Sequence, residues 1–155
     1  MTKLIKVFVY GTLKRGQPNH YLMTDKSNGY SKFITIGETI VSFPLVVATR
    51  YNIPFLLNRP GMGNQISGEI FEVDEKMFAV LDKLEDYPSW YDREIQEINA
   101  NGEKIPCWIY TLKIFPEKML QLPYLRSYEN TKDKQYIESY NDDLQQLFDE
   151  YFKRN

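Results

Sequence analysis

The sequence has very few of the side chains that hold metals or form cross-links: one cysteine, Cys107, and one histidine, His20, in 155 residues. A single cysteine cannot form an intramolecular disulfide, and the two residues together cannot supply the usual ligands of a structural zinc ion. They lie far apart in the sequence without a catalytic-cysteine signature, which argues against a Cys–His nucleophilic pair. We predict no metal, no cofactor and a reducing compartment, with the cytoplasm as the default location.

A long apolar run and an excess of charge are also missing. The first apolar stretch spans only about seven residues, too short for a signal-peptide core or a membrane span. Nineteen basic and 21 acidic residues are interspersed and leave a net charge of −2. No basic stripe indicates nucleic acid and no cationic amphipathic segment indicates a membrane. A small-molecule or protein partner is therefore favoured.

Glycine motifs that bind phosphate are absent, but one glycine follows a strand-like segment directly. Residues 4–10 (LIKVFVY) read as a buried strand that stops at Gly11. Where a strand ends in glycine, the next peptide N–H groups can turn inward together and bind an anion or a developing oxyanion. Gly11 can take a positive φ and leaves room for a ligand. The alternative is an ordinary strand-ending turn.

The residues after Gly11 add to this candidate site. Thr12 offers a hydroxyl and Leu13 an apolar wall, whereas Lys14 and Arg15 are expected outside the pocket, where they would add only a mild positive field.

Alternating apolar residues and intervening turn residues predict most of the sheet. The further expected strands are residues 33–40, 44–49, 53–57, 66–73, 93–100 and 104–109. Asn101-Gly102 is the pair favoured in tight hairpins, and Gly68 marks a bulge or a close backbone approach. Strands, one helix and more strands predict an α+β fold with a mainly antiparallel sheet that could close into a barrel.

Two helices are expected within this sheet-rich region. Asp74 stands where an N-cap belongs, before an apolar-periodic run that ends at Leu84. Asn19 could cap a shorter helical turn over residues 20–23.

The longer helix directs one carboxylate toward its apolar side. With Met77 at zero and about 100° per residue, Leu81 and Leu84 lie close to Met77, Phe78 lies near 100°, and Glu85 falls between Leu81 and Phe78 at about 80°. Burial disfavours a charged carboxylate and raises its pKa, which suits a general base that later acts as an acid. The alternative is that the helix frays before Glu85 and leaves it solvated.

The C-terminal part has a different texture. Residues 122–128 look irregular, residues 129–135 are polar, and residues 139–153 form an amphipathic pattern of helical period. We predict a domain over residues 1–128, followed by a polar segment and helical appendage over 129–155. The C-terminal helix would pack on this domain or on a second copy, which would make a homodimer.

Together the motifs resemble those of the γ-glutamylamine cyclotransferases, in the γ-glutamylcyclotransferase-like superfamily. The matching stretches are, in order, YGTLKRGQPNH, FPLV, NIPFLL, GEIFEVDE and LDKLEDYPSWYDRE. The likeness covers roughly residues 5–128. It implies a small mixed-sheet barrel with flanking helices, a glutamyl-binding loop at Tyr10, Gly11, Thr12 and Leu13, and Glu85 as the catalytic base. Tyr91 and residues 53–55 are further expected pocket residues.

The resemblance implies an activity that needs no cofactor. The substrate's own α-amine would attack its γ-carbonyl, releasing an amine and 5-oxoproline, with γ-glutamyl-ε-lysine from transglutaminase cross-links as the implied substrate class. Two alternatives stay open: a cyclotransferase for γ-glutamyl amino acids, and a non-catalytic binding module of the same fold.

Overall fold

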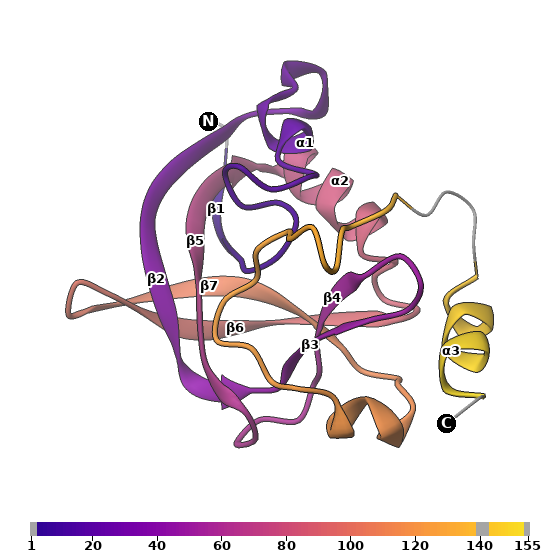
Figure 1. The fold of residues 1–155 in the computed structure, drawn as a ribbon. Helices are drawn as coiled ribbons and strands as arrows, with labels where there is room; N and C mark the ends of the chain where they lie inside the picture. The colour runs from indigo at the N-terminus through magenta and orange to yellow at the C-terminus, as the bar shows by residue number, and fades with distance from the viewer. Residues whose placement is uncertain (1–2, 139–142, 154–155) are drawn as a thin grey trace.

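Five strands close into a barrel in the computed structural model, which describes residues 3–138 and 143–153. Neighbouring strands around the barrel are β1 (Leu4–Val9), β5 (Asn64–Asp74), β2 (Ser31–Phe43), β6 (Tyr91–Ala100) and β7 (Glu103–Leu112). Strands β1 and β7 pair in parallel, and the other pairs are antiparallel. Beside the barrel, β3 (Leu45–Ala48) and β4 (Ile53–Leu56) form a two-stranded sheet (Figure 1). The predicted mixed, mainly antiparallel α+β fold is confirmed.

Strand β1 is paired with a neighbouring strand on each side. Phe8 pairs with Ile70 of β5, and Val7 pairs with Trp108 of β7. The second half of β1 is buried, as expected for an apolar, β-branched run in a strand with two neighbours. The pairing with β5 and β7 holds the end of β1 in the barrel, and the loop that follows therefore starts from a fixed position.

The hairpin between β6 and β7 follows its turn residues. Asn101 and Gly102 have φ values of 54° and 87°, and Ala100 pairs with Glu103 across the turn. Positive φ at both central residues is the requirement that Asn-Gly meets. The predicted turn is confirmed, and the returning strand is longer than the residues 104–109 expected.

Helix α2 (Glu75–Leu84) begins as predicted. The Asp74 side chain accepts a hydrogen bond from the Met77 N–H at 2.8 Å, and Met77 and Leu81 are fully buried. Leu84, expected in the same buried stripe, is 41% exposed. That expectation was wrong because the helix ends at Leu84, beside an open cavity described below.

The short helices depart further from the sequence prediction. Helix α1 (Tyr21–Thr24) has His20, not Asn19, at its N-cap position, and the His20 side chain makes no capping hydrogen bond, so the predicted Asn19 cap is wrong. The Asn19 amide instead bonds to two hydroxyls from other segments. Two 3-10 helices, η1 (Lys26–Asn28) and η2 (Glu117–Gln121), lie after α1 and after β7. No helix among the described residues is long and apolar enough to cross a bilayer.

The C-terminal part folds back on the barrel. After η2 the chain crosses one side of the barrel toward α2, and α3 (Leu144–Phe152) follows (Figure 1). Residues 139–142 of the predicted helix lie outside the described residues. Phe148 of α3 is buried. Its ring centroid lies 5.4 Å from that of Phe55 and 6.0 Å from that of Trp90. Of the two expected surfaces, the helix thus packs on its own domain.

Gly68 of β5 lies beside the end of β1, and the predicted close approach of the backbone is confirmed. A Cβ at this position would lie 2.5 Å from both the Phe8 Cζ and the Val9 carbonyl oxygen. Because the Val9 oxygen is backbone, a side chain here must shift β1 itself.

Replacing Gly68 with alanine is expected to lower the free energy of unfolding by about 2–3 kcal/mol, since overpacking against backbone has no easy relief. The control is Gly16→Ala. The φ of Gly16 is +80°, but apart from its chain neighbours no described residue has an atom within 4 Å of the added Cβ, so backbone strain alone should cost about 1 kcal/mol. Urea unfolding of both variants tests this. Equal losses would contradict the proposed crowding.

Candidate active site

A cavity of about 490 Å³ lies between the loop after β1, the end of α2, the strand β4 and the C-terminal segment. The sequence-predicted residues lie around this one cavity: Tyr10, Gly11, Thr12, Leu13, Glu85 and Tyr91. Ile53, Pro54 and Phe55 line it as well. Residues distant in the sequence therefore meet at the end of the first strand.

Gly11 is needed at its position for a different reason from the one expected. Its φ does not lie in the left-handed region, so the expectation of a positive φ was wrong. A Cβ on Gly11 would instead lie 3.2 Å from the Pro54 Cγ. The absent side chain lets the loop pack closely against β4, and the turn is held by a hydrogen bond from the Lys14 N–H to the Gly11 carbonyl at 3.2 Å.

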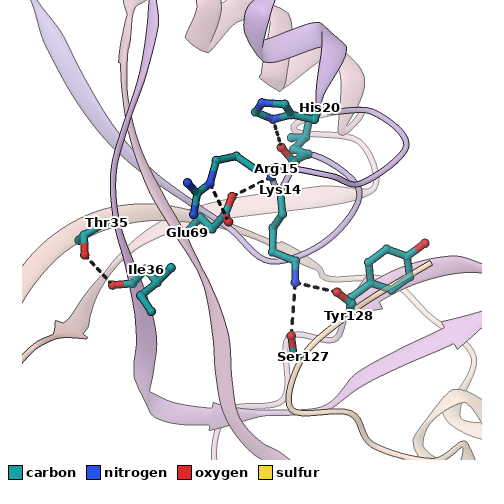
Figure 2. A network of polar contacts seen from close by, with 9 residues as sticks. Lys14, Arg15, His20, Thr35, Ile36, Glu69, Ser127 and Tyr128 are labelled. Atoms are coloured by element: carbon teal, nitrogen blue, oxygen red, sulfur yellow. Dashed lines mark hydrogen bonds and ion pairs between the residues drawn. The ribbon is translucent and has the colours of Figure 1, made fainter. Parts of the chain in front are cut away.

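The two cations after the loop fasten it to its surroundings, as Figure 2 shows. Lys14, expected to add only a field, is buried, and its Nζ donates to the Tyr128 carbonyl at 2.6 Å and the Ser127 Oγ at 3.3 Å. The Arg15 N–H and Nε contact the two Glu69 carboxylate oxygens at 2.8 and 3.2 Å. Both cations lie outside the cavity lining, as predicted, but they fix the loop through direct contacts.

His20 and Cys107 do not form a catalytic pair. The His20 Nδ1 lies 3.0 Å from the Leu13 carbonyl oxygen, so the ring helps to hold the loop (Figure 2). Cys107 is buried in β7, and burial raises the pKa of its thiol to about 12. Neither residue lines the cavity. No group of three or more potential metal ligands lies among the residues that the structure describes.

Asn19 is a cavity residue that the sequence reasoning missed. Its Nδ2 donates to the Thr12 Oγ1 at 3.0 Å and to the Tyr136 hydroxyl at 3.1 Å. Asn19 is buried, and all three residues line the cavity. Nothing in the local pattern of residues 17–23 points to Tyr136, which is 117 residues away.

Glu85 stands at the C-cap of α2, so the helix does end before it. Its backbone N–H bonds to the Leu81 carbonyl at 3.0 Å, and Asp86 follows with a φ of 50°. The carboxyl is nevertheless directed to the cavity, and Glu85 is half-buried. Burial raises its pKa to about 7, with a further contribution from the negative charge of Asp86. Near neutral pH this group can both accept and donate a proton.

Tyrosines surround this carboxyl. Burial, followed by the charge of Glu85, raises the pKa of Tyr10 and that of Tyr91 well above the ordinary value. The Tyr10 hydroxyl donates to the Tyr110 carbonyl at 2.7 Å. These phenols therefore remain protonated and uncharged around Glu85, and they contribute apolar ring surface that reduces its hydration.

The end of α2 is secured from the outer side by a charged cluster. Asp82 accepts a hydrogen bond from the Tyr110 hydroxyl at 2.6 Å and pairs with the Arg93 Nε at 2.9 Å. The guanidinium of Arg93 lies over the rings of Phe78 and Tyr87, 4.4 Å from each centroid. These contacts tie the last turn of α2 to β6 and β7, and so position the carboxyl of the C-cap residue.

The chain is similar in sequence and fold to proteins of one family. A family model described as "Gamma-glutamyl cyclotransferase, AIG2-like" matches residues 7–134. The Drosophila melanogaster protein CG2811, whose name assigns it provisionally to the γ-glutamylcyclotransferases, is 58% identical over 134 residues, 86% of this chain and 85% of that protein. The Mus musculus gamma-glutamylaminecyclotransferase is 46% identical over 132 residues, 80% of this chain and 89% of that protein. A crystal structure of an AIG2-like Mus musculus protein matches with a TM-score of 0.85 at 43% identity, covering 90% of this chain and 99% of that one.

Replacing Glu85 with glutamine is expected to stabilise the protein at alkaline pH. The pKa of Glu85 is raised from 4.5 in the unfolded chain to about 7 in the folded protein. The contribution of Glu85 to stability is therefore fully present below pH 4.5, where the carboxyl is protonated in both states, and it is lost as the pH rises through 7 and the buried carboxyl must ionise. The variant should therefore gain on the order of 3 kcal/mol in free energy of unfolding near pH 8.5 and little near pH 4.5. Chemical denaturation at both pH values measures the difference. A gain independent of pH would contradict the raised pKa.

Proposed function

The chain belongs to the AIG2-like γ-glutamyl cyclotransferase family, and from this premise we propose that it is a γ-glutamylamine cyclotransferase, an enzyme that converts γ-glutamyl amines into free amine and 5-oxoproline. One observation carries this proposal. Glu85, a carboxyl with a pKa near 7, faces the same cavity as Tyr10, Gly11, Thr12 and Leu13. The family indicates the reaction class, and the cavity holds a carboxyl suited to proton transfer beside the loop that follows β1.

The proposed reaction needs little from the protein because the substrate carries its own nucleophile. The α-amine nitrogen attacks the γ-carbonyl carbon, a five-membered ring closes, and the bond to the departing amine nitrogen breaks. Intramolecular attack gains much of its rate from proximity. The walls of the cavity would hold the γ-glutamyl chain in the folded conformation that brings these two atoms together.

Glu85 would perform both proton transfers. As a carboxylate it takes the proton that the α-amine loses on attack, and as a carboxylic acid it returns that proton to the departing amine. A pKa near 7 keeps both forms accessible at neutral pH. Peptide N–H groups of the loop at residues 10–13 would stabilise the oxyanion formed at the γ-carbonyl.

We propose γ-glutamyl-ε-lysine, the isopeptide product of transglutaminase cross-link breakdown, as the substrate class. The rival is a γ-glutamyl amino acid, and it has support of its own, since the name of the CG2811 protein refers to γ-glutamylcyclotransferase. The same base and loop would serve both reactions, and only the leaving-group side of the cavity would differ.

We also propose a cellular location and consider the state of assembly. A cytoplasmic location is favoured by the single, buried Cys107. The buried face of α3 is already covered by its own chain. A homodimer would therefore have to use the other face of α3, and it stays a prediction.

Incubation with γ-glutamyl-ε-lysine and with γ-glutamyl-alanine, followed by measurement of 5-oxoproline, tests the proposed activity. We expect turnover of the first substrate and a loss of about 10²–10⁴-fold in kcat for Glu85→Gln, which keeps the shape but not the basicity of the side chain. Turnover of γ-glutamyl-alanine alone would favour the rival substrate. If neither compound is converted, the non-catalytic binding module becomes the better explanation.

A second variant tests whether the charge beside Glu85 sets the pH dependence. Asp86→Asn removes a negative charge that raises the pKa of Glu85, and asparagine tolerates the left-handed backbone at this position. The acid limb of the kcat/KM profile should therefore move to lower pH. Glu103→Gln, at the tip of the β6–β7 hairpin, removes a distant negative charge and serves as the control. An unmoved acid limb in Asp86→Asn would contradict the role assigned to Glu85.

A further inference from the structure

The two N–H groups of the Asn19 amide are both in use. One donates to the Thr12 Oγ1 at 3.0 Å and the other to the Tyr136 hydroxyl oxygen at 3.1 Å. Each hydroxyl thus accepts a hydrogen bond and keeps its own proton to donate. Among the described residues, neither hydroxyl donates a hydrogen bond to an acceptor. Both residues line the cavity, where a ligand could supply the missing acceptor.

We propose that Asn19 sets the Thr12 and Tyr136 hydroxyls as a pair of donors for the α-carboxylate of the γ-glutamyl substrate and of the 5-oxoproline product. This inference rests on the proposed function and adds a substrate-binding residue, Tyr136, and a positioning residue, Asn19.

A carboxylate suits the spacing of the two donors. Two acceptors at 3.0 and 3.1 Å from one planar amide nitrogen lie roughly 5 Å apart, given the angle of about 120° between its N–H bonds. Two hydroxyls at that separation can each reach one oxygen of a single carboxylate from opposite sides. A single carbonyl oxygen can accept two hydrogen bonds, but with donors about 5 Å apart it would have to lie almost midway between them, too close to the Asn19 nitrogen.

Tyr136 is held in place on both sides of its own position. The Asn52 Nδ2 donates to the Gln135 carbonyl at 2.9 Å, and the Ile137 N–H donates to the Tyr51 carbonyl at 2.9 Å. The Tyr136 N–H itself donates to the Asn130 Oδ1 at 2.7 Å. These bonds fix the backbone of Tyr136 against the connection between β3 and β4, so its hydroxyl presents a defined direction to the cavity.

The same segment is joined to the substrate loop through Lys14 and Gln17. Lys14 bonds to the Tyr128 carbonyl at 2.6 Å, and the Gln17 Oε1 accepts from the Asn130 N–H at 2.9 Å (Figure 2 shows the Lys14 contact). The charge of Glu85 also helps to raise the pKa of Tyr136, after burial and Glu138. Tyr136 is therefore close enough to Glu85 for both to face one bound ligand, although it lies beyond the family match that ends at residue 134.

Titration with 5-oxoproline and with 2-pyrrolidinone, which has the same ring without the carboxylate, tests the assignment by NMR of the full-length protein. Tyr136→Phe should weaken 5-oxoproline binding about tenfold or more, the size expected for one hydrogen bond to a charged group. Its affinity for 2-pyrrolidinone should stay within about twofold of wild type. Tyr128→Phe is the matched control, because this tyrosine lies in the same segment and its buried hydroxyl has no hydrogen-bond partner in the described part of the chain.

Asn19→Asp tests the direction of the hydrogen bonds. The aspartate oxygens accept the hydroxyl protons that would otherwise reach the ligand, so 5-oxoproline binding should fall further than in Tyr136→Phe. In Asn19→Ala the two hydroxyls lose their orientation, and adding Tyr136→Phe should cost less than it does in wild type. The NMR spectra report whether each variant is folded.

Each other result would overturn the inference. If Tyr136→Phe or Asn19→Asp binds 5-oxoproline as tightly as wild type does, the two hydroxyls do not hold the carboxylate. The proposed function would still stand in that case, provided that the wild-type enzyme releases 5-oxoproline from its substrate. If Tyr136→Phe weakens both ligands equally, Tyr136 only shapes the cavity. If the wild-type protein forms 5-oxoproline but does not bind it, only the carboxylate assignment is overturned. If it neither forms nor binds 5-oxoproline, the proposed function is overturned as well.

Discussion

The loss of hydration at one carboxyl is the constraint on which the rest of the site depends. Glu85 is surrounded by tyrosine rings, and its charged form is disfavoured there. Such a group stays in place only if its backbone is fixed independently of its side chain. The hydrogen bond to Leu81 fixes it from within the helix, and the Asp82 cluster fixes the helix end from outside. The structure thus maintains a carboxyl that titrates near neutrality at the cost of some stability.

The loop after β1 differs from Glu85 in that its charged side chains point away from the cavity and hold the loop in place. Lys14 and Arg15 reach away from the cavity in different directions, to the C-terminal segment and to β5. Close packing of Gly11 against Pro54 removes the freedom that a glycine would otherwise have. A ligand would therefore meet a rigid loop, and little conformational entropy would be lost on binding.

Local signals in the sequence predicted the elements and one side of the site. The Asp74 cap, the Asn101-Gly102 turn and the strand ending at Gly11 each depend on neighbours within a few residues, and helical periodicity placed Glu85 toward the apolar face. The exposure of Leu84 was missed because it depends on a cavity, which periodicity does not describe. The contacts that join Lys14 and Asn19 to the C-terminal segment, including Tyr136, were missed because they link residues 113 to 117 positions apart, and neither spacing nor composition records such contacts.

The hydrogen bonds that join the two ends of the chain also bear on the order of assembly. During synthesis the barrel strands, which end at Leu112, leave the ribosome before Tyr136 does. The barrel strands can then pair while one wall of the cavity is still missing, and Tyr128 and Phe148 join the core later. That wall is complete only once Tyr136 has reached Asn19, so the cavity takes its final shape later than the barrel strands that surround it.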